Sequence, residues 1–323
     1  MTIKEIHLAG AFGIPAVVSS NQTHRAIDNW TSFFPFWKTC PNLPVYDAST
    51  RPASPEAVLI VINMNKDVLD GICDVLPLYG RKILVQFEGY LGWEAAYENC
   101  EKFDGFINFD RTYSNHPGFF PLRIPYFPNI ASSHMDKRGL AAMLDQRRYS
   151  GRVFLDIYLL RFLPRHRKAV MIAGLINRPH YQNRLQVAHQ YRQFVDVYGK
   201  AWPKEQVAWR GRCGSKMEVL RRYRYALVME NQRQPGYVSE KLLDAVIAGT
   251  VPIYWGAPDI NDLPGHEAII IMDDLNPPLE RYIADNSDYH RRRDILRREK
   301  RRLLELFNAA HFTEDLHKAI LGI

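Results

Sequence analysis

The fold is constrained most by a regular alternation of short apolar runs with helical stretches. The first series of apolar runs is IHLAG at 6–10, AVLIVINM at 57–64, KILVQF at 82–87 and FDGFINF at 103–109. Continuous apolar runs of this length are typical of strands buried on both faces of a sheet. The pattern therefore predicts a parallel sheet covered by helices.

A second series follows a charged, helix-forming segment at about 135–167. Its apolar runs are AVMIAG at 169–174, VDVYG at 195–199, YALVME at 225–230 and VPIYWG at 251–256, with a helical stretch at about 182–194. The chain has 323 residues, which is long for a single core. We expect two doubly wound, Rossmann-like α/β domains over 1–150 and 151–300, with C-terminal helices at 301–323 that pack back across them.

Most of the net charge of +7 is local. Between residues 291 and 302, eight Lys or Arg stand against two acidic residues, a net of +6. The apolar side chains of this stretch fall on one helical face: Tyr289, Leu296, Leu303 and Phe307. The pattern fits a solvated helix, or a helix that makes peripheral contact with an anionic membrane or an acidic partner. Nucleic acid is not expected as a partner, since no aromatic residues are interleaved with the basic ones.

Other patterns exclude several classes of protein. No apolar run approaches the length that spans a bilayer, and the N-terminus lacks a basic leader with an apolar core, so we expect a cytoplasmic protein. The four cysteines lie far apart without a CxxC pair, which indicates reduced, structural thiols. No glycine-rich dinucleotide or Walker loop follows any expected strand, which argues against dehydrogenases and P-loop NTPases.

The segment ENQRQPGYVSEKLLDAVIAGTVPIYWG at 230–256 is the main candidate site. Glu230 and Asn231 follow an expected strand, at the sheet edge where α/β proteins bind ligands. Ser239 is a predicted N-cap and Gly249 a predicted helix stop, which defines a helix at 240–248.

The start of that helix suits a nucleotide diphosphate-sugar. Its free N–H groups and the positive end of its dipole favour a phosphate. Lys241 adds a positive charge there, Tyr237 adds a hydroxyl donor, and Glu240 can accept hydrogen bonds from sugar hydroxyls.

The run YALVMENQRQPGYVSEKLLDAVIAGTVPIYWGAPDI closely resembles the donor-binding signature of α-1,3/4-fucosyltransferases of glycosyltransferase family 10, which transfer fucose from GDP-fucose to oligosaccharides. The segments LVQFEGYLGW, FDGFINFD and LRIPYFP resemble further blocks of that family in the same order, and AGLINRPHYQNRLQVAHQYRQFVDVYGK resembles its arginine-containing block. The resemblance implies a GT-B architecture, in which two Rossmann-like domains face each other across a cleft. The sequence shows no membrane anchor, and in this respect it resembles the soluble bacterial or viral members of the family.

The resemblance also implies roles for individual residues. Glu88 matches the catalytic base, with Glu94 and Glu98 as alternatives nearby. Arg184 matches the family arginine and Asn177 the family asparagine; Arg178 is a rival for the arginine position.

Around the leaving diphosphate, the expected roles are complementary. Arg184 and Lys241 neutralise its charge, and Tyr237 and Asn231 add hydrogen bonds. Glu240 contacts ribose or fucose hydroxyls. Glu230 either contacts the ligand or orients the loop by accepting hydrogen bonds from backbone N–H groups.

The expected reaction is an inverting transfer of fucose from GDP-fucose to O3 or O4 of an N-acetylglucosamine or glucose unit of an oligosaccharide. No Asp-x-Asp follows a strand, and the only adjacent acidic pair after a strand-like run is Asp273 and Asp274. The resemblance implies that Arg and Lys replace a metal ion, so no essential metal or other cofactor is expected. Two alternatives stay open: a transferase for another nucleotide sugar such as GDP-mannose, and a non-catalytic sugar-nucleotide or glycan-binding protein.

Overall fold

The computed structural model describes residues 3–10, 43–122, 164–175, 181–307 and 309–323. These residues form two compact units. Unit 1 comprises residues 1–125, 234–237 and 307–323, and unit 2 comprises residues 126–233 and 238–306. The expected domain boundary at residue 150 lies outside the described residues.

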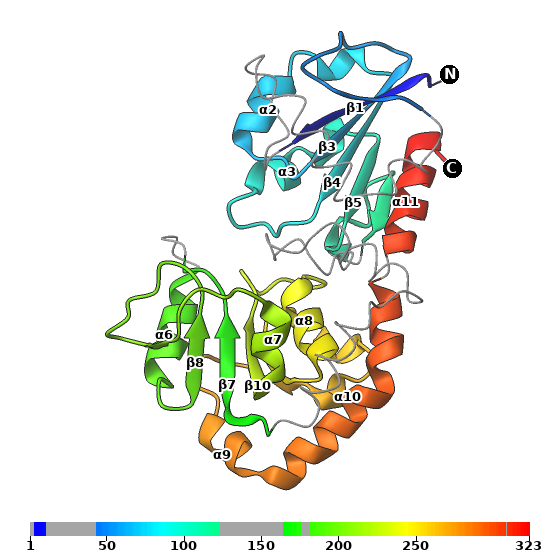
Figure 1. The fold of residues 1–323 in the computed structure, drawn as a ribbon. Coiled ribbons are helices and arrows are strands. Elements are labelled where there is room, and N and C mark those ends of the chain that lie inside the picture. Colours follow the sequence, from blue (N-terminus) through cyan, green and yellow to red (C-terminus); the bar gives the residue numbers. More distant parts are fainter. Residues whose placement is uncertain (1–2, 11–42, 123–163, 176–180, 308) are drawn as a thin grey trace, which may run out of the picture. The chain divides into compact units, whose positions relative to one another are not determined.

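Unit 1 is built on a parallel sheet with the strand order β2-β1-β3-β4-β5-β6 (Figure 1). Its strands are β1 (Glu5–Gly10), β2 (Val45–Asp47), β3 (Ala57–Ile62), β4 (Arg81–Gln86), β5 (Gly105–Asn108) and β6 (Phe119–Pro121). Every residue of the central strand β3 is buried, as its unbroken apolar sequence predicts. The short edge strands β2 and β6 carry no long apolar run, so the sequence pattern did not predict them.

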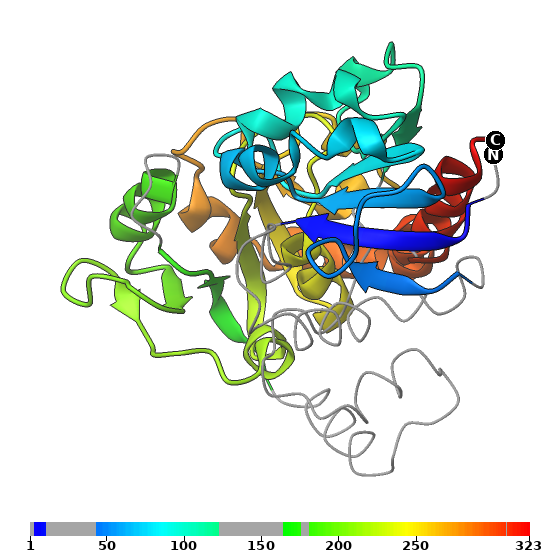
Figure 2. The same cartoon turned by 90° about the horizontal axis from the view of Figure 1, so that it is seen from above.

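Among the described residues of this unit, three α-helices accompany the sheet: α2 (Lys66–Ile72), α3 (Glu94–Glu98) and α11 (Ala309–Leu321). The last comes from the C-terminal end of the chain and packs against β4 and β5 (Figure 1 and Figure 2). Phe312 of this helix is buried, and its ring centroid lies 5.4 Å from that of Phe87, the residue after β4. The C-terminal end of the chain therefore supports the strand that precedes Glu88.

Unit 2 has a second parallel sheet with the order β12-β11-β10-β7-β8-β9. Its strands are β7 (His166–Ile172), β8 (Val195–Tyr198), β9 (Ala208–Trp209), β10 (Tyr223–Met229), β11 (Val251–Trp255) and β12 (Ile270–Ile271). With β7 counted as the first strand, the order reads 3-2-1-4-5-6, that of a dinucleotide-binding Rossmann sheet. Its topological switch point lies between β7 and β10, whose carboxyl ends are where such sheets bind ligands.

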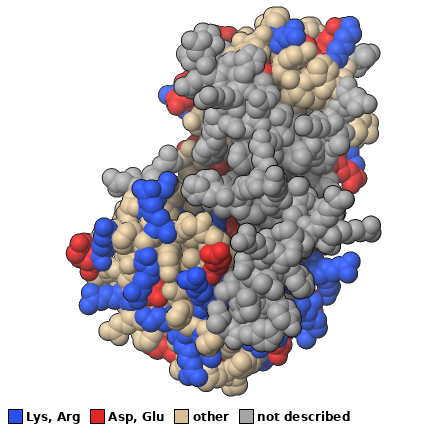
Figure 3. Space-filling view, viewed as in Figure 1, with Lys and Arg blue, Asp and Glu red and all other residues tan. Residues whose placement is uncertain are grey.

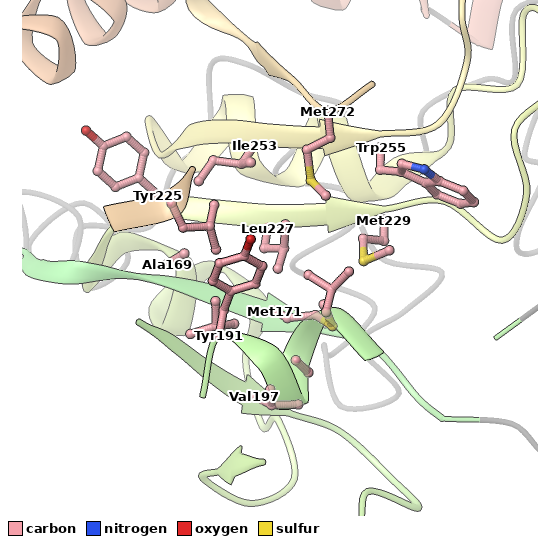
Figure 4. Close-up of a cluster of buried hydrophobic side chains, with 14 of the residues drawn as sticks. Ala169, Met171, Tyr191, Val197, Tyr225, Leu227, Met229, Ile253, Trp255 and Met272 are labelled. Atoms are coloured by element: carbon pink, nitrogen blue, oxygen red, sulfur yellow. The ribbon is translucent and has the colours of Figure 1, made fainter. Parts of the chain in front are cut away.

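The helices of unit 2 are α6 (Gln182–Gln190), α7 (Lys216–Arg221), α8 (Glu240–Ala248), α9 (Leu279–Ala284) and α10 (Asn286–Leu306). Figure 4 shows the core on one side of the sheet, where Met171, Leu227, Ile253 and Trp255 from three neighbouring strands pack together. These side chains come from the apolar runs that predicted the strands.

Most predicted elements are confirmed to within a few residues, but the helix expected over 182–194 is shorter. It ends at Gln190, because the N–H of Phe194 bonds to the carbonyl of Tyr191 in a turn that leads directly into β8. The helix predicted at 240–248 has those bounds. Gly249 adopts φ 67°, the left-handed conformation that closes the helix.

Candidate functional site

The start of α8 is organised by one buried carboxylate. Glu230 is 1% exposed and accepts hydrogen bonds from the backbone N–H of Ser239 (2.9 Å) and from its hydroxyl (2.6 Å). Ser239 caps the helix, and its Oγ accepts a 2.9 Å bond from Nζ of Lys241. The same ammonium lies 3.4 Å from Oε2 of Glu230. Glu230 thus orients the loop before the helix through backbone and hydroxyl groups.

A second lysine joins this cluster from α7. Nζ of Lys216 lies 3.0 Å from a carboxylate oxygen of Asp244 and 3.6 Å from one of Glu240, which is also 3.8 Å from Lys241. Burial opposes ionisation of Glu240, but Lys241 and Lys216 outweigh it and lower its pKa to about 2. Glu240 is therefore a carboxylate at neutral pH and can accept hydrogen bonds from hydroxyl groups.

Arg184 lies at the switch point of the sheet. It is 3% exposed, and its guanidinium donates to the carbonyl of Met229 at 2.9 Å and to the side-chain oxygen of Asn231 at 2.7 Å. A longer bond of 3.4 Å reaches the carbonyl of Gly174, after β7. Its guanidinium also stacks 4.6 Å above the ring of Tyr181. Arg184 thus joins the segments that follow β7 and β10.

The two lysines line a small cavity against the sheet. Its walls are residues 170–173 of β7 and the turn after it, residues 226–229 of β10, and the side chains of Lys216, Lys241 and Asp244. The volume of about 20 Å³ has room for one water molecule. Two ammonium groups, each paired with carboxylates, are therefore held beside the two strands that flank the switch point.

In unit 1, the backbone of Glu88 is fixed by buried side chains at the end of β4. Its carbonyl accepts a 2.7 Å bond from the hydroxyl of Tyr97 and a 3.1 Å bond from the side-chain amide of Gln86. Asn108, at the end of β5, donates to the carbonyl of Gln86 and to the Tyr97 hydroxyl. Burial raises the pKa of Tyr97 far above its usual range, so the hydroxyl stays protonated.

The carboxylate of Glu88 is contacted by the segment 234–237, which belongs to unit 1. The hydroxyl of Tyr237 donates to its Oε2 at 3.1 Å. The Tyr237 ring is 2% exposed and lies 5.1 Å from that of Phe109. Gln234 bridges two further groups, the N–H of Tyr90 (2.9 Å) and the carboxylate of Asp110 (2.7 Å).

A glycine allows this close approach. Gly236 adopts φ 73°, and a Cβ at this position would lie 2.5 Å from the carbonyl oxygen of Phe109. A larger residue would therefore push segment 234–237 away from the end of β5.

Part of the chain, including most of the residues just described, is similar to a known protein family. Residues 165–285 match the model of "Glycosyltransferase family 10 (fucosyltransferase) C-term". This stretch contains both lysines, Arg184 and the whole of α8. Residues 165–285 therefore carry a domain that matches the C-terminal part of glycosyltransferase family 10.

Individual relatives match the chain over short stretches. An alpha-(1,3)-fucosyltransferase of Helicobacter pylori is 46% identical over 46 residues, which cover 14% of this chain and 10% of the relative. A fucosyltransferase-like protein of Arabidopsis thaliana is 35% identical over 77 residues, or 22% of this chain and 15% of the relative. The matched stretches thus span less than a fifth of either relative's length.

A solved α1,3-fucosyltransferase is similar over nearly the whole chain. It matches with a TM-score of 0.66 at 15% identity, and the match covers 99% of this chain and 90% of that one. A structure of α1,3-fucosyltransferase with GDP-fucose matches at a TM-score of 0.52, again with 15% identity, over 92% of this chain and 82% of that one. Together with the two parallel sheets, these matches confirm the GT-B architecture predicted from the sequence.

The predicted site residues fall into three groups. Glu230, Ser239, Glu240 and Lys241 meet at the start of α8, and Arg184 and Asn231 meet at the switch point. Tyr237 contacts Glu88. Asn177 and its neighbour Arg178 lie outside the described residues.

The sequence pattern did not predict a role in the site for Lys216, Asp244 or Gln234. A signal existed for Lys216: it stands in the first turn of a helix that precedes a parallel strand, and such helices begin near the carboxyl edge of the sheet. Its N-cap, Ser215, accepts a bond from the N–H of Glu218. Gln234 carried no comparable signal, because its partners are distant in sequence.

Within the described ranges, no three His, Cys, Asp or Glu side chains are grouped so as to hold a metal ion. In the same part of the chain, no helix combines the length and apolar character needed to cross a membrane. Cys73, Cys100 and Cys213 are free thiols.

Proposed function

We propose that the chain is an inverting fucosyltransferase that moves L-fucose from GDP-fucose to O3 or O4 of an N-acetylglucosamine or glucose unit of an oligosaccharide. The observation that carries this proposal is the pair of ammonium groups, Lys216 and Lys241, held beside a Rossmann switch point within a family 10 domain. The fucosyltransferase relatives and the neighbour solved with GDP-fucose support the choice of donor.

The transfer requires one base and a stabilised leaving group. The carboxylate of Glu88 takes the proton of the acceptor hydroxyl as that oxygen forms a bond to the anomeric carbon. The bond from this carbon to the diphosphate oxygen breaks on the opposite face, and GDP leaves with the bonding electrons. Inversion at the anomeric carbon follows from this single displacement.

Charge on the departing GDP is balanced by cationic side chains. Lys241 and Lys216 supply two ammonium groups, and the first N–H groups of α8 add to them. Arg184 acts through the segments that it joins, because its guanidinium is bonded to Met229 and Asn231. Glu240 binds a ribose or fucose hydroxyl.

We extend the proposal to a reaction without an essential metal, because lysines occupy the role that a divalent ion has in other transferases. Turnover that persists in EDTA is the expected result. Complete loss in EDTA with recovery in Mn²⁺ would show that this part of the proposal is wrong.

Substitution of Glu88 tests the reaction directly. Glu88→Gln keeps the shape of the side chain but removes the base, and we expect transfer to fall by about 10²- to 10⁴-fold. Binding of GDP-fucose should be retained, as measured by calorimetry. Glu101→Gln is the matched control, because Glu101 is an exposed acidic residue of the same unit, in the helical turn at 100–102, and does not line a cavity named here. Equal activity of Glu88→Gln and the wild type would remove Glu88 as the base.

Donor choice is tested by thermal shift with GDP, GDP-fucose, GDP-mannose and UDP-sugars. A ligand present at 100 times its Kd adds about 2.7 kcal/mol to the free energy of unfolding, which is a visible shift. Stabilisation by GDP and GDP-fucose supports the proposal. Preference for GDP-mannose favours the alternative donor, and binding of GDP-fucose without transfer favours a non-catalytic binding protein.

We also propose a cytoplasmic protein whose basic helix meets an anionic membrane. Figure 3 shows Lys and Arg at the lower right, where α10 runs in Figure 1, as well as over the left side of unit 2. The side chains of Arg297, Arg298 and Arg302 are 56%, 69% and 74% exposed. Co-sedimentation with vesicles of anionic lipid, and loss of it when these three are changed to Gln, is the expected result; equal sedimentation with neutral vesicles would contradict it.

A further inference from the structure

Unit 1 contains a cavity that is lined neither by Glu88 nor by the residues of the proposed donor site. It is a groove between α2 and α3, lined by residues 65–67, 69 and 70 on one side and by residues 92–95, 98 and 99 on the other. Its volume of about 470 Å³ lies within the range of small-molecule sites. Both walls follow the carboxyl ends of strands, β3 and β4, so the groove lies at the edge of the sheet where α/β proteins bind ligands.

The lining combines one indole with many hydrogen-bonding groups. Trp93 lines the groove and is partly buried, because it also packs against the core of unit 1. The polar lining residues are Asn65, Lys66, Asp67, Asp70, Glu94, Glu98 and Asn99. A sugar ring offers an apolar C–H face that packs on an indole and hydroxyl groups that donate to carboxylates and amides.

The charge of the groove restricts its ligand. Four carboxylates stand against the single ammonium of Lys66, a net charge of −3. Among the described residues, no three acidic side chains are placed so that they could hold a metal ion together. The four carboxylates of the groove therefore do not form a metal site of that kind. The negative charge of the groove would repel an anionic sugar, while the hydroxyl groups of a neutral sugar would find many hydrogen-bond acceptors there.

The groove is joined to the loop that carries Glu88. The N–H of Gly92 donates to Glu94 at 2.8 Å, and the hydroxyl of Tyr90 donates to Glu98 at 2.9 Å. Both carboxylates line the groove, and both donors stand within four residues of Glu88. An oligosaccharide with one hydroxyl at Glu88 therefore has a second binding surface within reach of its neighbouring units.

We propose that the groove between α2 and α3 binds a neutral sugar unit of the acceptor, next to the unit that receives the transferred sugar, and that it excludes sialylated or sulfated acceptors. The proposal rests on the proposed function, since it assigns part of the acceptor site of the same reaction.

The test uses the full-length protein and two probes, a neutral N-acetyllactosamine-type tetrasaccharide and the same glycan with a terminal sialic acid. The variants are Trp93→Ala, Trp93→Phe, and Asp70→Lys. Asp74→Lys is the matched control, because it reverses an exposed charge four residues after Asp70 without lining the groove. Saturation-transfer NMR of the sugar protons measures binding without turnover, and initial rates give KM and kcat.

For Trp93→Ala we expect the KM of the neutral acceptor to rise by about fivefold or more, since loss of one aromatic contact removes about 1 kcal/mol or more of binding. Trp93→Phe should recover part of this loss. Asp70→Lys should improve the sialylated acceptor relative to the neutral one, and Asp74→Lys should change neither. The Kd of GDP-fucose should stay the same in all four variants.

Failure of the two proposals gives different results. Unchanged KM values in Trp93→Ala and Asp70→Lys, with active enzyme, overturn the groove and leave the transferase intact. A second outcome is a wild type that gives sugar signals by NMR but no transfer. If those signals disappear in Trp93→Ala, the result supports the groove as a sugar site and overturns the proposed transferase activity. Wild-type protein that shows neither transfer nor sugar signals overturns both. Asp70→Lys decides the case if Trp93→Ala fails to fold, because Asp70 is exposed.

Discussion

The hydroxyl of Tyr237 donates a 3.1 Å hydrogen bond to the carboxylate of Glu88, across a separation of 149 residues in the sequence. Two residues after Tyr237 the chain reaches Ser239, the cap of the helix whose start holds Lys241. One short segment therefore contacts the proposed base and leads into the proposed diphosphate site.

Tyr237→Phe should slow transfer more than it weakens donor binding. A hydrogen bond to a charged group is worth about 1.5–3 kcal/mol, so kcat should fall by roughly ten- to a hundredfold if the bond positions the base. Because the lost donor stabilised the carboxylate form, the acidic limb of the pH–rate profile should also move to higher pH. A weaker affinity for GDP with unchanged kcat would instead place the hydroxyl on the diphosphate.

Gly236→Ala should detach the segment from unit 1. The added Cβ would meet the carbonyl of Phe109 at 2.5 Å and would also require a left-handed φ of 73°. We expect kcat of Gly236→Ala to fall at least as far as kcat of Tyr237→Phe. The double variant should have the same kcat as Gly236→Ala alone, because both changes remove the same contact. Gly214→Ala is the control, because a Cβ there meets nothing within 4 Å. Additive losses in the double variant would contradict a shared role.

Glu230→Gln should destabilise unit 2. The carboxylate accepts bonds from the N–H and hydroxyl of Ser239 and pairs with Lys241, and an amide can replace only part of this set. The loss should be about 1–3 kcal/mol in the free energy of unfolding, measured with urea. Glu280→Gln, an exposed carboxylate in the first turn of α9, should stay within about 0.5 kcal/mol of the wild type. Equal losses in both variants would show that the burial of Glu230 has no special effect.

Glu240 should contribute stability that depends on pH. Its pKa of about 2 lies below the ordinary 4.5, so its contribution is present above pH 4.5 and is lost as the pH falls toward 2. The wild type should therefore be more stable than Glu240→Gln at pH 6, and the difference should shrink between pH 4.5 and 2. Urea midpoints at several pH values measure this. A constant difference across the range would mean that the two lysines do not act on this carboxylate.

The core of the fold was readable from the sequence because its signals are local. The runs at 57–62 and 251–255 are buried along their whole length, and apolar side chains alone mark them as strands. Ser239 and Gly249 fixed the bounds of α8, since a cap and a left-handed stop each have a preferred residue type. The two-residue strand β9 has no such pattern, because its pairing with β8 depends on the sheet that precedes it.

The candidate site was readable only in part. Sequence placed Glu230 beside the helix start and left open whether it contacts the ligand or the loop; the structure gives it the loop contacts. The contact of Tyr237 with Glu88 could not be anticipated, since it depends on which unit the segment 234–237 joins. Lys216 and Asp244 meet because α7 and α8 pack together, a contact that residue type alone does not indicate.

The assignment of residues 234–237 to unit 1, between two stretches of unit 2, restricts how such enzymes can be recombined. A chimera that takes its donor unit from a relative also imports the residues that contact the base. Glu88 of the recipient would then meet a foreign counterpart of Tyr237, and Asp110 a foreign counterpart of Gln234. Exchange of donor specificity by grafting should therefore succeed only when these four residues are kept from the recipient.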